Sequence, residues 1–416
     1  MNRGHIYATH AATAGPYLDT GHAAIVITPT DVVVRSGITI TQLPTPAGLL
    51  SGPAQLLDWA ATFGREVTLV VWDLGLPRDA LRPMATHAGW TVPPLREADS
   101  WTPCKRETDG HVQAVYLCVI AWMVNADPML DGGSQHIATR LWDWYATTGV
   151  AYRYSPGASA LAGLVASNLS ARRRLQDPAT ADYWQPPGNI TDLRYAPRRM
   201  PAGTLHRWDM RNAYLAAAAA AELPTRQLQH TGNDYGEDVV GYFRVRPGDR
   251  PLGGLGKPDR QGCIWVTHSM LELLQPIEVV DSWTSEDHAR FLRPWAERWR
   301  NIVLARQASG PQYKMAYTQA IGLMAVPRGS FYRPDWRHMI IDRVRWSVIR
   351  RIRRVVELTG QSPVRVDVDS VWYDTNDPGL VDKAIGSGGH VGHMRYEGPG
   401  RLQRNDYGWR WIPDGE

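Results

Sequence analysis

Two short runs, far apart in the sequence, place aspartates beside apolar, β-prone stretches. The first run contains Asp209, and the second contains Asp367 and Asp369. The runs lie 158 residues apart, between positions 209 and 367, so only a folded core could bring them together. Two such strands side by side would offer clustered carboxylates, and Mg²⁺ is usually held by one or two carboxylates together with substrate phosphates. Two ions can clamp the attacking and leaving oxygens of a displacement at phosphorus, so the pattern predicts phosphoryl transfer, and more narrowly nucleotidyl transfer.

Each of these aspartates also has a purely structural interpretation. Strand alternation would place Asp367 and Asp369 on one face, where two carboxylates repel each other unless a cation lies between them. A solvated strand edge is the alternative for this pair. For Asp209 the alternative is a turn or cap residue at the end of a strand.

The bulk composition limits the class of protein. A length of 416 residues favours two or three domains. The net charge is only +4, and nearly all of the positive charge is arginine; arginine binds phosphate bidentately, but a GC-rich genome would give the same bias. The three cysteines have no zinc-site spacing and suit a reducing compartment. No apolar stretch is long enough for a membrane span, so we expect a cytoplasmic protein.

The order of apolar patterns predicts an α/β protein. Strands are expected at 24–28, 32–35, 66–73 and 239–245, and a Pro-rich connector at 185–199 gives the best domain boundary. An alanine-rich helix should follow Asp209. Further helices are expected at 138–147, from a Ser285 cap to about Val303, at 312–324 and at 335–358.

A predicted helical hairpin precedes the second aspartate run. On its second helix Lys314, Thr318 and Ile321 share one face at i, i+4 and i+7. Arg300 and Arg306, from the first helix, can approach the same end. Such a convergence of cations could bind a triphosphate; the alternative is a helix surface that arginine and lysine merely solvate.

Taken together, these motifs resemble the palm and fingers of family B DNA polymerases over about residues 150–400. The run from Asp209 to Leu215 looks like the first palm motif, with a tyrosine five residues after the aspartate. The run from Lys314 to Gly322 resembles the fingers motif. The run from Asp367 to Ser370 is similar to that family's Asp-Thr-Asp-Ser.

The resemblance implies a role for each matching position. Asp209 and Asp369 would hold two catalytic Mg²⁺ ions, for which Mn²⁺ could substitute, with the backbone carbonyl of Met210 as a further ligand. Asp367 would support the cluster, either as an occasional ligand or through its negative field. Tyr214 would exclude a ribose 2′-hydroxyl, with a plain core position as the alternative. The predicted nucleotide-binding set is completed by Arg300, Arg306, Lys314, Thr318 and Gly322.

The chain departs from the family pattern in three places. Thr318-Gln319 stands where Asn-Ser is usual, and Ile321 replaces the tyrosine before Gly322. Few residues follow the Asp367 strand, which implies a reduced thumb. The N-terminal region lies where the family has a ribonuclease-H-like exonuclease; it contains Asp19 and Asp73 but no Asp-x-Glu pair. We therefore expect a degenerate exonuclease domain without proofreading.

These inferences define one expected organisation and function. The fold is α/β with an α+β palm: a ribonuclease-H-like domain, a connector, a first palm part, two-helix fingers, then a second palm part with a minimal thumb. The corresponding ranges are 1–150, 151–200, 201–284, 285–325 and 326–416.

The expected activity is template-directed DNA synthesis by a compact polymerase of a phage or plasmid. Its partners would be primer-template DNA, dNTPs and, for protein-primed synthesis, a terminal protein. The main alternative is a catalytically silent protein, derived from a polymerase, that binds DNA ends or origins. A metal-dependent nuclease with its site in the N-terminal domain is a third hypothesis.

Overall fold

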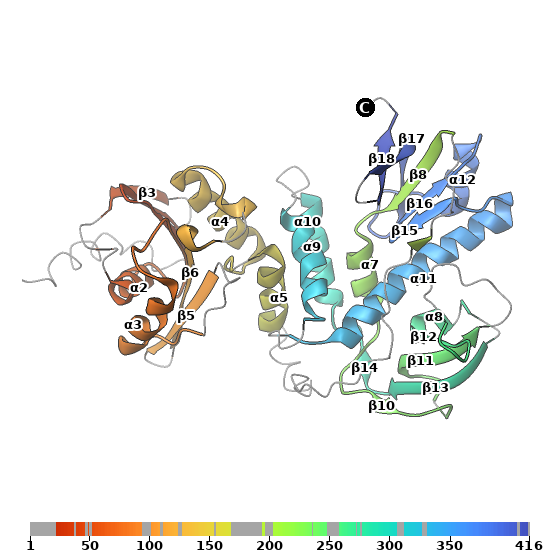
Figure 1. The fold of residues 1–416 in the computed structure, drawn as a ribbon, viewed down its shortest axis with the longest axis horizontal. Helices are drawn as coiled ribbons and strands as arrows, with labels where there is room; N and C mark the ends of the chain where they lie inside the picture. Colours follow the sequence, from red (N-terminus) through yellow and green to blue (C-terminus); the bar gives the residue numbers. More distant parts are fainter. Residues whose placement is uncertain are drawn as a thin grey trace, which may run out of the picture. The chain divides into compact units, whose positions relative to one another are not determined.

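The structure of the chain is a computed structural model. The residues it describes are 22–36, 39–45, 49, 52–93, 101–108, 111–123, 127–153, 155–167, 194–195, 203–234, 236–247, 258–271, 273–274, 277–305, 312–326, 331–405 and 408–414. They form several sheets and helices, which confirms the predicted α/β class (Figure 1). Within these residues, no helix is long and apolar enough to cross a membrane.

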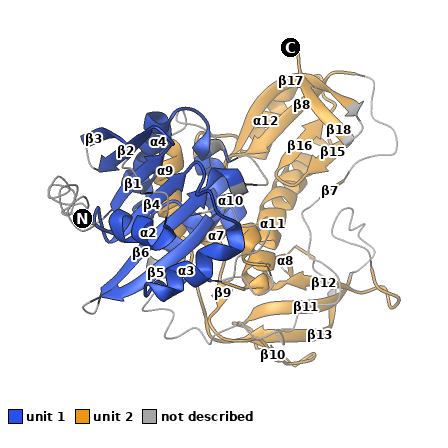
Figure 2. Ribbon diagram, turned by 60° about the vertical axis from the view of Figure 1, so that its left-hand side comes forward, with its two compact units in different colours: residues 1–167, 308–320 blue, residues 168–307, 321–416 orange. Residues whose placement is uncertain are grey.

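The chain divides into two compact units, coloured separately in Figure 2. Unit 1 contains residues 1–167 and 308–320, and unit 2 contains residues 168–307 and 321–416. The predicted fingers segment, 285–325, is therefore shared between the two units.

Unit 1 is built on a mixed six-stranded sheet with the order β3-β2-β1-β4-β6-β5. Strands β1, β4 and β6 run parallel to one another, while the β1–β2, β2–β3 and β5–β6 pairs are antiparallel. The strands are β1 (His22–Ile27), β2 (Asp31–Ser36), β3 (Thr39–Pro44), β4 (Glu66–Val71), β5 (Trp101–Thr108) and β6 (His111–Val119).

Helices cover this sheet, which explains its continuous apolar strands. All six residues of β1 are buried, as expected for a strand covered on both faces. One set of alternate residues, including Ile25 and Leu69, joins a core with Leu56 of α2. Helix α4 packs against β1 and β2. The helices of unit 1 are α2 (Pro53–Ala61), α3 (Leu81–His87), α4 (Ser134–Thr148), α5 (Pro156–Ser167) and most of α10 (Gln312–Leu323).

Unit 2 contains a six-stranded sheet in which every pair is antiparallel, with the order β18-β17-β8-β16-β15-β7. Strand β8 lies near the middle, although its neighbours come from the far C-terminal part of the chain. The strands are β7 (Arg194–Tyr195), β8 (Leu205–Met210), β15 (Arg365–Asp367), β16 (Ser370–Tyr373), β17 (Met394–Asn405) and β18 (Gly408–Pro413).

Helices pack against one face of this sheet. Trp208 of β8 is fully buried there, and its Nε1 donates a hydrogen bond over 2.8 Å to Asp382 of α12. The 26-residue helix α11 contacts both α12 and α7, as Figure 1 shows. Its buried N-terminal half and its Gly360 cap explain why its range was predictable. The helices of unit 2 include α7 (Ala213–Ala220), α8 (His268–Leu271), α9 (Arg293–Ala305), α11 (Pro334–Thr359) and α12 (Pro378–Ile385).

A smaller antiparallel sheet, with the order β10-β13-β11-β12, and a short β14–β9 pair complete unit 2. They correct the predicted helix start at Ser285, because Ser285 ends β13 and α9 begins only at Arg293. The intervening His288 and Ala289 pair with β9 instead. The strands are β9 (Leu223–Pro224), β10 (Gln229–His230), β11 (Val240–Pro247), β12 (Ile264–Thr267), β13 (Ile277–Ser285) and β14 (His288–Ala289).

Candidate active site

Asp367 ends strand β15, and Asp369 is the second residue of the tight turn that joins β15 to β16. Asp367 pairs with Ser370, which begins β16. Val368, between the two aspartates, has a φ of 59°, in the left-handed region. Because Asp369 lies in the turn and not in a strand, the prediction that strand alternation places the two aspartates on one face is wrong.

Strand β8 brings Asp209 to this turn. Asp209 is the cross-strand partner of Ser370, and the amide of Met210 donates a hydrogen bond over 3.0 Å to the carbonyl of Asp369. The two remote aspartate runs therefore meet at one end of the β8–β16 pair. Long-range strand pairing, rather than local propensity, creates this proximity.

Two side chains fix the carboxylate of Asp209. The hydroxyl of Ser370 donates a short hydrogen bond to its Oδ1. Arg207 Nη2 lies 3.2 Å from the same Oδ1 and also donates to Ser370 Oγ over 3.0 Å. Within the described part of the chain, both bonds go to Oδ1 and neither goes to Oδ2. Sequence reasoning did not identify Arg207, although its position two residues before Asp209 in a strand places both on one face.

Asp367 is held by arginines rather than by its neighbouring aspartates. Its carboxylate lies 2.9 Å from Arg365 Nη2 and 3.5 Å from Arg194 Nε. Across the described residues, no three His, Cys, Asp or Glu side chains form a group that could hold a metal ion. The Asp367 carboxylate is therefore engaged by two guanidinium groups.

The segment after Asp209 turns sharply into α7. Asn212 has a φ of 49° and precedes the helix, so that Tyr214 lies in its first turn and is half-buried. A glycine-rich loop fastens this turn: the Arg211 amide donates to the His393 carbonyl, and the Gly392 amide donates to the Arg211 carbonyl. These two backbone hydrogen bonds therefore fix the turn that joins Asp209 to the first turn of α7, where Tyr214 lies.

The predicted nucleotide-binding residues lie on α9 and α10. Lys314, Thr318 and Gly322 form an exposed stripe along α10, at i, i+4 and i+8. Ile321 is buried, which corrects its predicted place on the same face as Lys314. Arg300 is exposed on α9. Arg306 lies outside the described residues.

Unit 1 places no predicted catalytic residue in a defined site. Asp19 lies outside the described residues, and Asp73 accepts a hydrogen bond from the Gly75 amide in a local turn.

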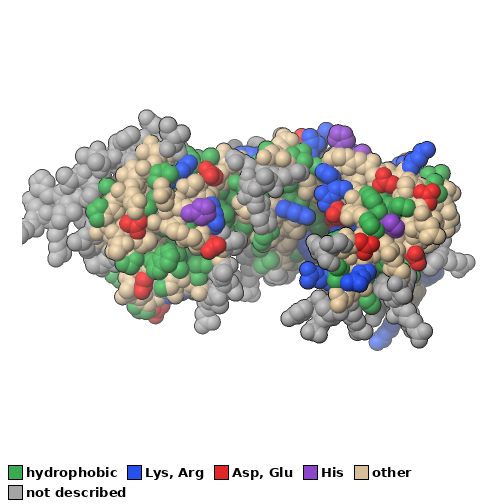
Figure 3. All heavy atoms as spheres, turned by 90° about the horizontal axis from the view of Figure 1, so that it is seen from above, with side chains coloured by type: hydrophobic (Ala, Val, Ile, Leu, Met, Phe, Trp, Pro, Cys, Tyr) green, Lys and Arg blue, Asp and Glu red, His purple; other side chains and the backbone are tan. Residues whose placement is uncertain are grey.

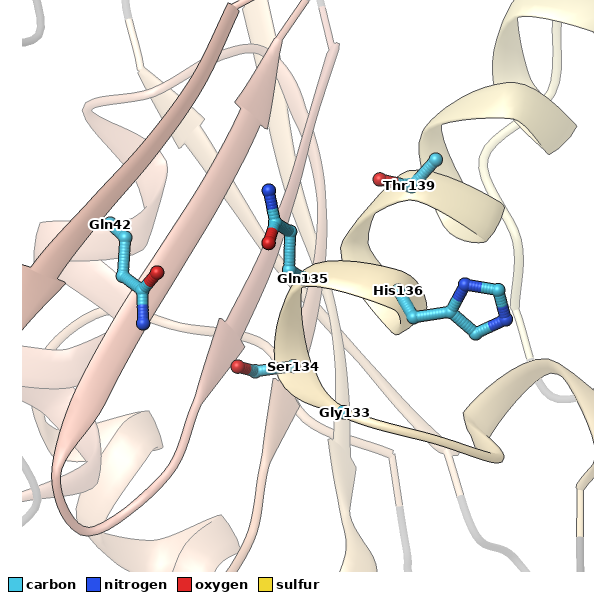
Figure 4. A pocket seen from close by; sticks show the side chains of 6 residues that line it. All are labelled: Gln42, Gly133, Ser134, Gln135, His136 and Thr139. Carbon is cyan, nitrogen blue, oxygen red and sulfur yellow. The ribbon is translucent and has the colours of Figure 1, made fainter.

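One pocket of about 520 Å³ opens between β3 and the start of α4 (Figure 4). The Asp31 carboxylate beside it accepts hydrogen bonds from Ser134 and Gln42, and it opposes anion binding at that helix end. The pocket is lined by Gln42, Gly133, Ser134, Gln135, His136 and Thr139.

Basic side chains gather on the part of the surface that unit 2 contributes to Figure 3, at the right of the view. On the six-stranded sheet, the row that contains Asp209 and Asp367 is flanked by Arg395 of β17 and Arg194 of β7. Directly opposed residues in antiparallel strands project to the same face. In this row the two carboxylates are therefore flanked by one arginine on each side.

Comparisons with known proteins agree with this architecture. Phi29 DNA polymerase in a binary complex with primer-template DNA matches with a TM-score of 0.52 and 10% identity, over 95% of this chain and 90% of that chain. The chain has the fold of phi29 DNA polymerase. The ternary complex of phi29 DNA polymerase with incoming nucleotide gives a TM-score of 0.54 and 11% identity, over 91% of this chain and 84% of that chain. No protein-family model and no curated protein matched the sequence. The predicted likeness to a compact, phage-type family B polymerase is thus confirmed at the level of the phi29 polymerase fold.

Proposed function

We propose that this protein is a template-directed DNA polymerase that transfers nucleotides from dNTPs to a primer end. The single observation that carries the proposal is the junction of β8 with the β15–β16 turn, where the Met210 amide bonds to the Asp369 carbonyl and Asp209 pairs with Ser370. The fold supports it, because phi29 DNA polymerase with this fold has been solved in complex with primer-template DNA and nucleotide substrates.

The residues at this junction fit Mg²⁺ in their chemistry. Asp209, Asp369 and the Met210 carbonyl offer the hard oxygen atoms that Mg²⁺ prefers. Two such ions, when bound, would activate the primer hydroxyl and stabilise the leaving pyrophosphate. Asp367, with its two arginine partners, would add to the field around the site without being a direct ligand. Ser370 and Arg207 would keep the Asp209 carboxylate in a fixed orientation.

The remaining predicted residues would select and position the nucleotide. Tyr214, in the first turn after Asp209, would pack against the sugar and exclude a 2′-hydroxyl. Lys314, Thr318 and Gly322 form the exposed stripe of α10 that would meet the triphosphate, with help from Arg300 and Arg306. Because little covalent chemistry is required of the protein, positioning and charge neutralisation would supply most of the rate.

We propose further that unit 1 is a ribonuclease-H-like domain that lacks proofreading. Its strand order, with three antiparallel strands followed by parallel β4 and β6, supports the fold. The apolar sequence of β1, His22–Ile27, offers no carboxylate at its centre for a nuclease metal site. The proposed partners of the whole protein are primer-template DNA and dNTPs, with a terminal protein if synthesis is protein-primed.

A catalytically silent DNA-binding protein is the second candidate. The observation that favours it is the arginine pairing of both Asp209 and Asp367, since guanidinium groups satisfy carboxylates that a metal would otherwise neutralise. The polymerase proposal requires that these pairs orient the carboxylates without displacing the metal.

Primer extension distinguishes the two candidates. The parent protein is incubated with a primed template, Mg²⁺ and dNTPs, beside Asp369→Ala and the control Asp374→Ala. Asp374 is exposed and follows β16 directly, so its loss tests a general effect of removing an acidic residue from this hairpin. Extension by the parent and the control, but not by Asp369→Ala, supports the polymerase. Retention of DNA by all three without extension would instead support the binding protein.

A further inference from the structure

Trp372 occupies the centre of an arginine–tryptophan–arginine row. Each member of this row lies two residues along its strand from the row that contains Asp209, Ser370 and Asp367. In the six-stranded sheet, Trp372 of β16 is the cross-strand partner of Arg207 on one side and Arg365 on the other. The guanidinium carbon of Arg207 lies 5.4 Å from the centre of the indole ring, and that of Arg365 lies 5.3 Å from it. Both distances fall within the range of cation–π attraction.

Each of these guanidinium groups also holds one of the two aspartates. Arg207 Nη2 lies 3.2 Å from Asp209 Oδ1, and Arg365 Nη2 lies 2.9 Å from Asp367 Oδ2. A continuous set of contacts therefore joins Asp209 to Asp367 through a single uncharged ring. Ser370, between the two carboxylates in the next row, adds the hydroxyl that Arg207 and Asp209 share.

Trp372 and Arg365 are largely buried, whereas the Arg207 side chain is 26% exposed, so packing constrains the first two most tightly. Trp372 is only 4% exposed, and the side chain of Arg365 is 11% exposed. Among the described residues, the buried Nε atoms of Arg207 and Arg365 have no hydrogen-bond acceptor. Buried donors without acceptors are costly, and the negative face of the indole ring offsets part of that cost. Replacing the ring would leave both guanidinium groups without this support.

A second tryptophan, Trp411, packs against the ring of Trp372. The rings of Trp372 and Trp411 meet edge to face, with centroids 6.4 Å apart. Trp411 belongs to β18, which β17 and β8 separate from β16. The Trp411 ring lies over Gly400 of β17, where a Cβ would be 2.6 Å from Trp411 Cζ2, so the absence of a side chain at Gly400 leaves room for it. The ring of Trp372 is therefore fixed from several directions.

We infer that Trp372 is a positioning residue for the divalent-cation site, because it aligns the two arginines that orient Asp209 and Asp367. The inference rests on the proposed function only in assuming that the Asp209 site takes a divalent cation. Groups that orient the ligands of a metal commonly change its affinity by about 10-fold to 100-fold when removed. Trp372 carries no net charge, so its replacement changes this orientation without changing the net charge around the site.

The test measures Mn²⁺ binding by electron paramagnetic resonance, with primer extension followed separately. Mn²⁺ is titrated into the parent, Trp372→Met, Trp372→Phe and Asp209→Asn, and urea denaturation confirms that each variant is folded. Asp209→Asn should remove one Mn²⁺ site. Trp372→Met should lower the Mn²⁺ affinity of that same site by about 10-fold. Trp372→Phe keeps an aromatic face and should stay within about 3-fold of the parent.

The matched control is Trp346→Leu on α11. Trp346 is also placed between two arginines, with Arg343 at 4.0 Å and Arg350 at 5.0 Å from its ring centre, but it lies outside the six-stranded sheet. This control should leave Mn²⁺ binding unchanged. If Trp372→Met does not fold, Arg365→Lys serves instead, because it keeps the charge and loses the planar group over the ring; it should also weaken Mn²⁺ binding.

Three results would overturn the inference. The first is an unchanged Mn²⁺ affinity in Trp372→Met, or in Arg365→Lys where that variant takes its place. The second is an equal loss of Mn²⁺ affinity in Trp346→Leu, and the third is a parent protein without an Asp209-dependent Mn²⁺ site. Failure of the proposed function looks different. A parent that binds Mn²⁺ through Asp209 but extends no primer removes the polymerase proposal and leaves the role of Trp372 standing. If the parent extends primers but Trp372→Met binds Mn²⁺ as tightly as the parent, the polymerase proposal stands and the inferred role of Trp372 is lost.

Discussion

Ser370 donates its hydroxyl hydrogen bond to the carboxylate of Asp209 across the β8–β16 pair, and the same hydroxyl accepts a bond from Arg207. A side-chain hydrogen bond to a charged group contributes about 1.5–3 kcal/mol. Ser370→Ala should therefore lower the rate of primer extension by at least about tenfold while the protein stays folded. The measurement is a single-turnover extension assay. Ser347→Ala on α11 is the control, and equal rates for both variants would contradict the assigned role.

Tyr214→Ala should admit ribonucleotides. Tyr214 lies in the first turn of α7, five residues after Asp209, where its ring would contact the sugar of a nucleotide held at that carboxylate. The discrimination between dNTP and rNTP, measured as a ratio of kcat/KM values, should fall by at least about tenfold, because the steric exclusion of the 2′-hydroxyl is lost. Tyr195→Ala, at an exposed position of β7, provides the control. Unchanged sugar discrimination in Tyr214→Ala would remove the gate assignment.

Breaking the buried ion pair at the start of α11 should lower the free energy of unfolding far more than breaking an exposed ion pair. Arg333 and Asp335 are 2% and 0% exposed, and Arg333 also donates to the Pro224 carbonyl over 2.7 Å. Arg333→Ala leaves a buried carboxylate unpaired, and we expect a loss of about 3–5 kcal/mol in the free energy of unfolding. Arg293→Ala breaks the exposed pair with Glu297 and should cost about 0.5 kcal/mol or less. Urea denaturation measures both; similar losses would contradict this account of α11.

Gly400→Ala should destabilise the β17–β18 hairpin. A Cβ at Gly400 would lie 2.4 Å from the Ile412 carbonyl oxygen and 2.6 Å from the Trp411 ring, so backbone and side chain would both have to move. Overpacking of this kind costs about 1–3 kcal/mol. Gly203→Ala, where no atom of the described residues lies within 4 Å of the added Cβ, should be close to neutral. Thermal unfolding compares the two, and an unchanged melting temperature for Gly400→Ala would show that the Trp411 contact is not as close as described.

The protein should lose stability in mild acid through its buried histidines. Burial lowers the pKa to about 3 for His22 and to about 4 for His268 and His338. Below about pH 6.5 the unfolded chain binds protons that the native state does not. The stability that these neutral rings contribute is full above that pH and falls as the pH drops toward the folded pKa, by up to about 1.4 kcal/mol per pH unit for each ring.

A single substitution isolates the contribution of one ring. His22→Phe keeps the stacking against Tyr145, whose ring centre lies 4.1 Å away, and removes the titrating group. The free energy of unfolding, measured in urea at about pH 7 and about pH 5, should then depend less on pH than in the parent. His87→Gln, at an exposed position, should leave the dependence unchanged. An equal dependence in His22→Phe and the parent would contradict the burial of His22.

Local patterns predicted the long elements and the meeting of the two aspartate runs, but not the side chains between them. Helix α11 was predictable because its apolar stripe and Gly360 cap are local signals. The Asp367–Asp369 turn was missed because the left-handed Val368 interrupts what looks like one continuous strand. Arg207, Arg365 and Trp372 were missed because only the cross-strand register of β8, β16 and β15 brings them into one row. The sequence does not encode that register locally.

The central claim is that Asp209 and Asp369 jointly hold the divalent cations for nucleotidyl transfer. Anomalous diffraction from crystals of the protein with primer-template DNA, an incoming dNTP and Mn²⁺ tests it most directly. We expect anomalous peaks bound by the carboxylates of Asp209 and Asp369, and none at that place in Asp369→Ala. Mn²⁺ bound elsewhere, or a nucleotide seated without any peak at these two residues, would contradict it.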